Sequence, residues 1–273
     1  MRHVCLLSLF LLNESVIACR ATTVDAEPGP DDARADAIYG GVADKSAHAA
    51  VVMIAHPDGD GLALCTASLI APRVLLTAAH CVVVDSPTYV SCGGSTSDRE
   101  LSAIAAATLT VHTGYRPKLE SAPAARGRRI FVPKLSSLCD RDIAVVVLDR
   151  ALAFAPQPLA GALPDDDTSL TAVGYGLTEH GTSGERRRRE GMRILTVGPS
   201  WDGGLWLGAR ELETSGGPCS GDSGGPLLDE DDAIVGVVSR GGSCRRDDGN
   251  IYSSAIGHST FIADALAWAE DNP

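Results

Sequence analysis

Three short segments of the sequence carry the residue types that can activate a serine. They are LTAAHC, which contains His80, DIAVVVL, which begins at Asp142, and GDSGGP, which contains Ser223. A serine hydroxyl is unreactive near neutral pH unless an imidazole accepts its proton and a buried carboxylate holds that imidazole in the correct tautomer. The sequence therefore offers one histidine, one aspartate and one serine in settings that suit nucleophilic catalysis.

The order and the glycines of these segments narrow the chemistry. The chain order histidine, aspartate, serine differs from the order in subtilisin-type enzymes and in α/β-hydrolases. The glycines around Ser223 permit a sharp backbone turn, in which the amides of Gly221 and Ser223 can converge on a developing oxyanion. Each such donor contributes about 3–4 kcal/mol to transition-state stabilisation.

Short β-branched runs separated by Gly, Pro, Asp and Ser must position these segments. Such runs indicate strands, and they predict an all-β fold. The runs are Val51–Ala55, Val74–Thr77, Ala144–Leu148, Ile194–Val197 and Ile234–Val238. The exception is Thr260–Glu270, where apolar residues recur at roughly helical spacing and predict a C-terminal helix.

Composition and charge exclude several other classes of protein. The 273 residues are 44% hydrophobic, which is enough for a core and excludes wholesale disorder. A net charge of −12 would be repelled by phosphate backbones, so we expect no nucleic-acid partner. Arg186–Arg189 is a run of four arginines, for which we expect a solvated exposed loop, with a docking patch for an acidic partner as the alternative.

The first 37 residues have the composition of an export signal followed by a linker. Residues 1–18 contain an apolar run of signal-peptide length, too short to span a bilayer. Cys19 ends a lipobox-like VIAC segment, which predicts lipidation and a membrane tether; ordinary cleavage after Ala18 or Ala21 is the alternative. Residues 19–37 alternate acidic residues, prolines and small residues, so we expect a disordered propeptide or linker before a domain at 38–273. We therefore expect an exported protein, either a cell-envelope lipoprotein or secreted.

Taken together, the three segments resemble those of the trypsin/chymotrypsin family of serine proteases. The resemblance extends from the IYGG segment at Ile38 to the C-terminal helix, and the three motifs are specific jointly although each alone is weak. It implies that His80 is the general base, Asp142 its orienting partner and Ser223 the nucleophile. It also implies two six-stranded antiparallel β-barrels with the active site in the cleft between them.

The family resemblance also bears on the cysteines. The eight cysteines lack metal-ligand spacing, and two of them, Cys5 and Cys19, lie in or end the signal. The resemblance implies one disulfide between Cys65 and Cys81 around the histidine and a second between Cys219 and Cys244. Cys92 and Cys139 then remain as a third pair. We expect no metal ion and no other cofactor.

The family resemblance assigns the substrate pocket. Its floor falls on Gly217, where no carboxylate is available for Arg or Lys, and one wall on Ser239, Arg240 and Gly241. Arg240 replaces a usual aromatic residue and would favour acidic residues upstream of the cut. Asn250 falls on the far wall, where its bulk should shorten the pocket. We therefore expect cleavage after small or medium apolar residues such as Ala, Val or Leu.

The IYGG segment implies activation by cleavage between Ala37 and Ile38. In the resembled family, the new ammonium group of such an Ile pairs with the aspartate before the nucleophile, here Asp222. Ala37 replaces the usual Arg or Lys, which disfavours a trypsin-like activator and suits the pocket predicted above.

The sequence predicts an exported, monomeric endopeptidase that acts on proteins or peptides. Two other functions remain open at this point. A catalytically silent homologue could bind a partner through the same cleft, although it would not need an intact triad. A non-proteolytic acyl hydrolase would need a differently shaped cleft, which nothing in the sequence requires.

Overall fold

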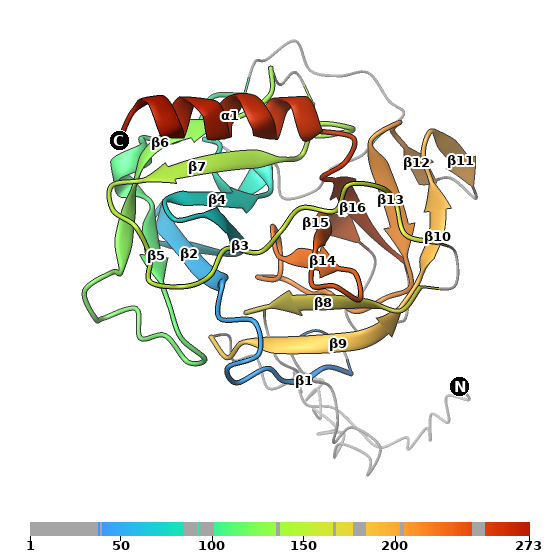
Figure 1. Ribbon diagram of the computed structural model, residues 1–273, viewed down its shortest axis with the longest axis horizontal. Coiled ribbons are helices and arrows are strands. Elements are labelled where there is room, and N and C mark those ends of the chain that lie inside the picture. Colours follow the sequence, from blue (N-terminus) through green and yellow to red (C-terminus); the bar gives the residue numbers. More distant parts are fainter. Residues whose placement is uncertain are drawn as a thin grey trace, which may run out of the picture. The chain divides into compact units, whose positions relative to one another are not determined.

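The computed structural model describes residues 38, 40–84, 92, 101–134, 137–165, 168–176, 184–202, 205–241 and 249–273. Its secondary structure is mostly β, with one α-helix at the C-terminus (Figure 1). Every strand predicted from the β-branched runs is present, and the helix α1 (Ser259–Asp271) covers the predicted Thr260–Glu270. The fold class expected from the sequence is therefore confirmed.

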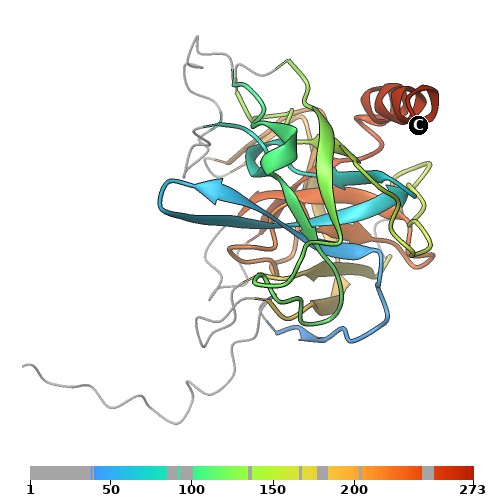
Figure 2. The same ribbon diagram turned by 90° about the vertical axis from the view of Figure 1, so that its left-hand side faces the viewer.

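The first half of the chain forms a closed six-stranded barrel. Its order is β2-β3-β4-β7-β6-β5, and every neighbouring pair is antiparallel. Alternate residues of these strands fill the interior, with Val52, Leu75 and Val146 fully buried. The β2–β3 hairpin continues beyond the rest of the barrel (Figure 2). The strands are β2 (Val51–Asp58), β3 (Gly61–Ala71), β4 (Val74–Thr77), β5 (Thr110–His112), β6 (Ala125–Phe131) and β7 (Ala144–Leu148).

The second half forms an eight-stranded antiparallel sheet in the order β1-β9-β8-β14-β15-β16-β13-β10. β9 and β10 are separated only by Arg193, so the sheet curls until β10 meets β13. If β9 and β10 are counted as one strand, six strands surround a core that includes Leu227 and Tyr252, and β1 pairs with the outer side of β9 as an edge strand. The strands are β1 (Val42–Ala43), β8 (Leu170–Gly174), β9 (Arg187–Met192), β10 (Ile194–Val197), β13 (Glu211–Thr214), β14 (Pro226–Leu228), β15 (Ile234–Gly241) and β16 (Asn250–Ser254).

The smaller elements complete the fold. Two 3₁₀ turns, η1 (Ala79–Cys81) and η2 (Ala106–Thr108), belong to the first half. A hairpin of β11 (Ser200–Asp202) and β12 (Leu205–Leu207) extends the second half. Helix α1 lies beside β6 and β7 (Figure 1), and its Ile262 and Ala265 pack into a core shared with Val145.

The run Arg186–Arg189 is not the exposed loop that the sequence predicted. Arg187–Arg189 belong to β9, and the Arg186 side chain is only 2% exposed. Its guanidinium donates to Asp44 at 2.6 Å and to the carbonyl oxygens of Val51 and Lys45. A buried arginine is tolerated when its donors are satisfied in this way. The run therefore forms part of the second sheet, and Arg186 bonds this sheet to the chain that precedes β2.

Candidate active site

The three residues of the proposed triad come from both halves of the fold. His80 lies in η1, directly after β4, and Asp142 lies two residues before β7. Ser223 lies in the turn that leads into β14 of the second sheet. β4 and β7 are hydrogen-bonded neighbours, so their ends bring His80 and Asp142 together.

His80 and Asp142 form a tightly connected pair. The Nδ1 atom of His80 lies 2.8 Å from Oδ2 of Asp142, and the His80 amide donates to Oδ1 at 2.9 Å. Ser239 donates its hydroxyl hydrogen to Oδ2 at 2.6 Å. These bonds fix the imidazole so that Nε2 faces away from Asp142, which is the orientation that a general base requires.

The contact between His80 and Asp142 shifts the pKa of each residue so that its charged form is favoured. Burial alone would raise the pKa of Asp142, but the charge of His80 and the bonds from His80 and Ser239 hold it below its usual value. Burial alone would lower the pKa of His80, but the charge and hydrogen bond of Asp142 raise it above its usual value. The unprotonated, basic form of His80 is therefore lost as the pH falls through this raised pKa.

The turn that carries Ser223 approaches the histidine loop closely. The Thr66 amide donates to the Ser223 carbonyl oxygen at 2.8 Å. Sγ of Cys81 lies 3.7 Å from Nε2 of His80 and 3.6 Å from the same carbonyl oxygen. His80 and the Ser223 backbone therefore share one sulfur neighbour. Within the described residues no hydrogen bond joins the Ser223 hydroxyl to His80; in a free enzyme such a bond often tightens only when substrate binds.

Gly224 permits this close approach. Its φ is +76°, and a Cβ there would lie 2.9 Å from the Ala78 amide nitrogen and would overlap the Thr77 hydroxyl oxygen. A side chain at this position would therefore separate the serine turn from the histidine loop.

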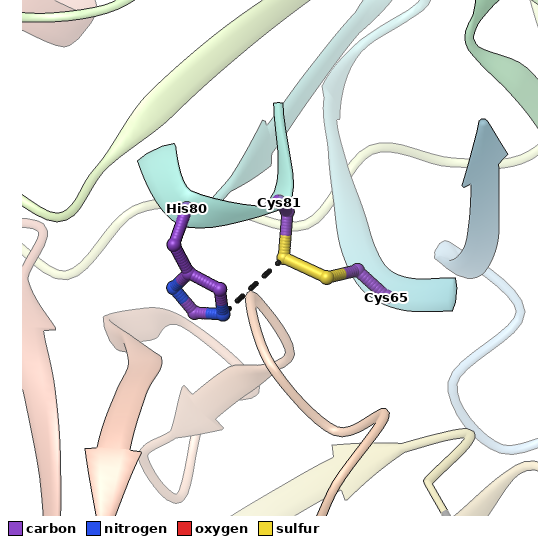
Figure 3. A group of neighbouring side chains, drawn as sticks. All are labelled: Cys65, His80 and Cys81. Atoms are coloured by element: carbon purple, nitrogen blue, oxygen red, sulfur yellow. Dashed lines mark hydrogen bonds between the residues drawn. A yellow bond between two sulfur atoms is a disulfide. The ribbon is translucent and has the colours of Figure 1, made fainter. Parts of the chain in front are cut away.

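The Cys65–Cys81 disulfide lies beside the imidazole, as Figure 3 shows. Cys65, His80 and Cys81 are close enough to resemble a metal-ligand group. Because both sulfurs are bonded to each other, neither is a thiolate that could bind a metal ion. This cluster is a cross-link that supports His80.

The backbone of the serine turn leaves two amides available. Gly221 has a φ of +96°, and a Cβ there would lie 2.9 Å from Cα of Gly176, so the turn requires glycine. No described residue accepts a hydrogen bond from the amide of Gly221 or Ser223, whereas the Asp222, Gly224 and Gly225 amides are all bonded. Two neighbouring amides without an acceptor are what an oxyanion hole needs.

Asp222 is fully buried behind this turn. Its carboxylate accepts hydrogen bonds from the amides of Gly176 at 2.8 Å and Cys219 at 2.9 Å, and from the Ile38 backbone. Burial raises the pKa of Asp222 to about 6. Ile38 is itself 0% exposed. The structure thus brings together the two residues that the sequence paired for activation; Ala37 lies outside the described residues.

The expected pocket residues lie on facing strands and turns. Asn250, in β16, is 5% exposed, and a side chain on Gly241 of β15 would overlap its Oδ1 atom. Beyond Gly217, the space is occupied by Met192 and Arg189, whose Sδ and Cδ atoms would lie 3.2 and 3.4 Å from a Cβ there. These contacts support a short pocket in which the Met192 and Arg189 side chains pack against Gly217.

Arg240 does not point freely toward substrate. Its guanidinium makes two hydrogen bonds to the buried carboxylate of Glu211, at 2.6 and 2.8 Å. The expectation that Arg240 selects acidic residues therefore loses its basis, because Glu211 neutralises the charge. Glu211 was not recognised in the sequence, where a single glutamate in a short strand gives no signal.

The structure contains the disulfides Cys65–Cys81 and Cys92–Cys139, with Cα atoms 6.1 and 5.8 Å apart. Cys219 is also disulfide-bonded. Its expected partner, Cys244, lies outside the described residues, as does Cys19. Across the described part of the chain, no helix is long and apolar enough to cross a membrane.

Comparison with known proteins identifies the family. The family model described as Trypsin matches residues 38–263. Glucanase inhibitor protein 3 of Phytophthora infestans is 27% identical over 78% of this chain and 79% of its own. Trypsin beta of Drosophila erecta is 26% identical over 76% and 78%, and Trypsin of Saccharopolyspora erythraea is 28% identical over 73% and 84%. The family match spans most of the chain, and the closed barrel and curled second sheet described above agree with it, so this protein belongs to the trypsin family.

Proposed function

We propose that the protein is an exported serine endopeptidase that hydrolyses peptide bonds through an acyl-enzyme on Ser223. The observation that carries this proposal is the bond of 2.8 Å between His80 and the fully buried Asp142, in a chain of the trypsin family. A buried carboxylate that orients an imidazole serves proton transfer, and it has no evident purpose in a pure binding protein.

In this mechanism His80 accepts the proton of the Ser223 hydroxyl as the oxygen attacks the substrate carbonyl. Asp142 stabilises the imidazolium that forms, and the amides of Gly221 and Ser223 stabilise the oxyanion. The imidazolium then protonates the leaving amine, which leaves an ester on Ser223. Water, activated by the same imidazole, hydrolyses this ester and restores the enzyme.

The proposal is tested by cleavage of an unfolded protein substrate by the purified mature chain. Wild-type protein should cut internal peptide bonds, and His80→Ala should not, while His56→Ala serves as the control. His56 lies near the end of β2, and among the described residues its imidazole hydrogen-bonds only to the neighbouring Pro57 carbonyl oxygen. Equal activity in wild-type and His80→Ala protein would refute the proposal.

A silent homologue that binds a protein partner is the second candidate function. The observation in its favour is the similarity to Glucanase inhibitor protein 3, whose name describes an inhibitor. The two candidates differ in one respect that can be measured. A binding protein would show no turnover as the wild type, and its Ser223→Ala variant would still bind the partner.

The pocket geometry predicts cleavage after Ala, Val or Leu. A glycine at position 217 offers no carboxylate to an incoming Arg or Lys, and a buried guanidinium without a partner costs several kcal/mol. We therefore expect kcat/KM for peptides ending in Ala, Val or Leu at the cut to exceed that for Arg by about 100-fold. Asn250→Gly should lengthen the pocket and raise the rate for a Phe peptide about tenfold.

These rates are measured on a peptide series that differs only at the residue before the cut. The control variant is Asn272→Gly at the end of α1, which should leave the ranking unchanged. Preferred cleavage after Arg or Lys would contradict the pocket assignment.

We propose activation by a cut between Ala37 and Ile38, which would separate the leader and linker from a protease domain at 38–273. The support is the buried Ile38, whose backbone already bonds the Asp222 carboxylate. After the cut, the Ile38 nitrogen becomes an ammonium group that compensates this buried charge, which fixes the turn bearing Gly221 and Ser223. N-terminal sequencing of active enzyme should begin at Ile38, and a different start would contradict the proposal.

The small residue at Ala37 fits the proposed pocket, so the enzyme is suited to activate itself. Ser223→Ala should then accumulate as the longer precursor, held at the membrane if Cys19 is lipidated. Processing of purified Ser223→Ala at the normal rate would assign the cut to another protease. We propose that the mature enzyme acts as a monomer, which size-exclusion chromatography can test.

A further inference from the structure

Glu211 is a buried carboxylate for which the proposed mechanism has no role. Its side chain is 0% exposed. Oε1 accepts from Arg240 at 2.6 Å and from the Asp140 amide at 2.8 Å, while Oε2 accepts from Arg240 and from the Gly208 amide, each at 2.8 Å. Four hydrogen bonds, two of them from a charged guanidinium, hold this carboxylate in one orientation.

Arg240 connects this carboxylate with the triad. It follows Ser239 in β15, and its Nη1 atom lies 3.5 Å from the Ser239 hydroxyl oxygen. Ser239 in turn donates to Oδ2 of Asp142, the oxygen that also bonds His80. Arg240 is further anchored by the Trp206 carbonyl oxygen at 3.2 Å. A continuous set of contacts therefore runs from Glu211 through Arg240 and Ser239 to the triad.

Glu211 also connects the two halves of the fold directly behind Asp142. It belongs to β13 of the second sheet, but it accepts from the amide of Asp140, two residues before Asp142 in the first half. A second hydrogen bond joins the same segments, because Oδ1 of Asp140 accepts from the amide of Arg210, the residue before Glu211, at 2.6 Å. The adjacent Cys139 is tied to Cys92. The loop that carries Asp142 is thus held on one side by a disulfide and on the other by Glu211.

We propose that Glu211 and Arg240 are a positioning pair of the triad: Glu211 fixes the loop of Asp142 to the second sheet and cancels the charge that Arg240 brings to Ser239. Neither residue touches the reacting atoms. The proposal rests on the proposed serine protease function, and it adds two residues that the triad motifs do not contain.

Charge balance around the triad makes the pair testable. The other charged or titratable groups at this place are Asp140 and Arg210, whose side chains are 3.9 Å apart, and His258 at the start of α1. Burial lowers the pKa of His258 to about 4, so it is neutral at working pH. With Asp140 opposed by Arg210, removal of either member of the Glu211–Arg240 pair leaves one uncompensated charge near Asp142 and His80.

The experiment compares Glu211→Gln, Arg240→Met and the double variant. Both single variants should lower kcat about 10- to 100-fold with little change in KM, because the triad is displaced while the pocket persists. Glu211→Gln leaves a cation that disfavours the imidazolium, so the acid limb of kcat/KM should move to lower pH by about half a unit or more. Arg240→Met leaves an anion, so the limb should move to higher pH, and the double variant should return toward wild type.

The matched control is Glu185→Gln, which makes the same chemical change in a glutamate that pairs with the exposed Arg116 at 2.8 Å. It should leave kcat and the acid limb unchanged. Shifts in the same direction in both single variants would mean general loosening of the fold and would overturn the proposal. Unchanged kcat and pH limb in all three variants would also overturn it.

Two further measurements keep the result decisive. If Arg240→Met does not fold, Arg240→Lys retains the charge and should keep the wild-type acid limb while losing the bidentate bond and part of kcat. NMR titration of the His80 imidazole gives the same opposite pKa shifts without turnover. If the wild type is inactive but the two single variants still shift the His80 pKa in opposite directions, only the protease function is refuted. If the wild type is active but the variants do not shift the His80 pKa, only the role of the Glu211–Arg240 pair is refuted.

Discussion

Replacing Ser223 with alanine is expected to lower kcat about 10⁶-fold, which is the loss typical of removing the nucleophile of such a triad. Ser223 lies in the turn formed by Gly221 and Gly224, and the Thr66 amide holds its carbonyl oxygen at 2.8 Å beside the histidine loop. The variant should fold normally and still bind peptide substrates, since Ser223 does not belong to any of the hydrophobic core clusters of the described residues. The measurement is kcat on a peptide substrate, together with thermal unfolding.

The control for this change is Ser220→Ala, an exposed serine three positions away in the same turn. It loses a hydroxyl of the same size near the same glycines and should retain full activity. A Ser223→Ala enzyme that keeps even one hundredth of the wild-type rate would contradict the assignment of the nucleophile.

Replacing Asp142 with asparagine is expected to lower kcat about 10⁴-fold near neutral pH. An asparagine amide would retain the shape of the site, but its NH₂ group would compete as a donor for Nδ1 of His80 and favour the wrong tautomer. The loss of the carboxylate charge should also lower the pKa of His80, because that charge raises it in the native protein. The acid limb of the remaining activity should therefore move to lower pH.

Asp149→Asn provides the control at the other end of β7. Asp149 bonds the Arg126 amide and the exposed Arg150, and it makes no described contact with the triad. It should leave both kcat and the acid limb unchanged. An Asp142→Asn enzyme with an unshifted acid limb would show that another group supports His80.

The sequence predicted the elements that place the triad because short-range patterns determine them. β4 and β7 are runs of β-branched and apolar residues with the boundaries that the pattern indicated, and His80 follows β4 by three residues while Asp142 precedes β7 by two. Helical spacing likewise located α1. Glycine at 221 and 224 predicted a sharp turn, and the positive φ angles show why no other residue fits well.

Features that depend on contacts between distant segments could not be predicted. The run Arg186–Arg189 reads as a solvated loop, yet Arg186 is buried because Asp44, 142 positions earlier, supplies its counter-charge. Arg240 reads as a free cation because Glu211, 29 positions away, lies in a separate strand. Such pairs satisfy buried charges across the fold, and neither spacing nor composition reveals them.

The most direct test of serine protease function is covalent labelling by a fluorophosphonate probe, followed by identification of the modified peptide. The mature, disulfide-bonded protein should be labelled stoichiometrically on Ser223, and its peptidase activity should disappear in proportion. His80→Ala should be labelled far more slowly, and Ser223→Ala not at all. A correctly folded protein that begins at Ile38 and does not react with the probe, or that is labelled at another residue, would contradict the account.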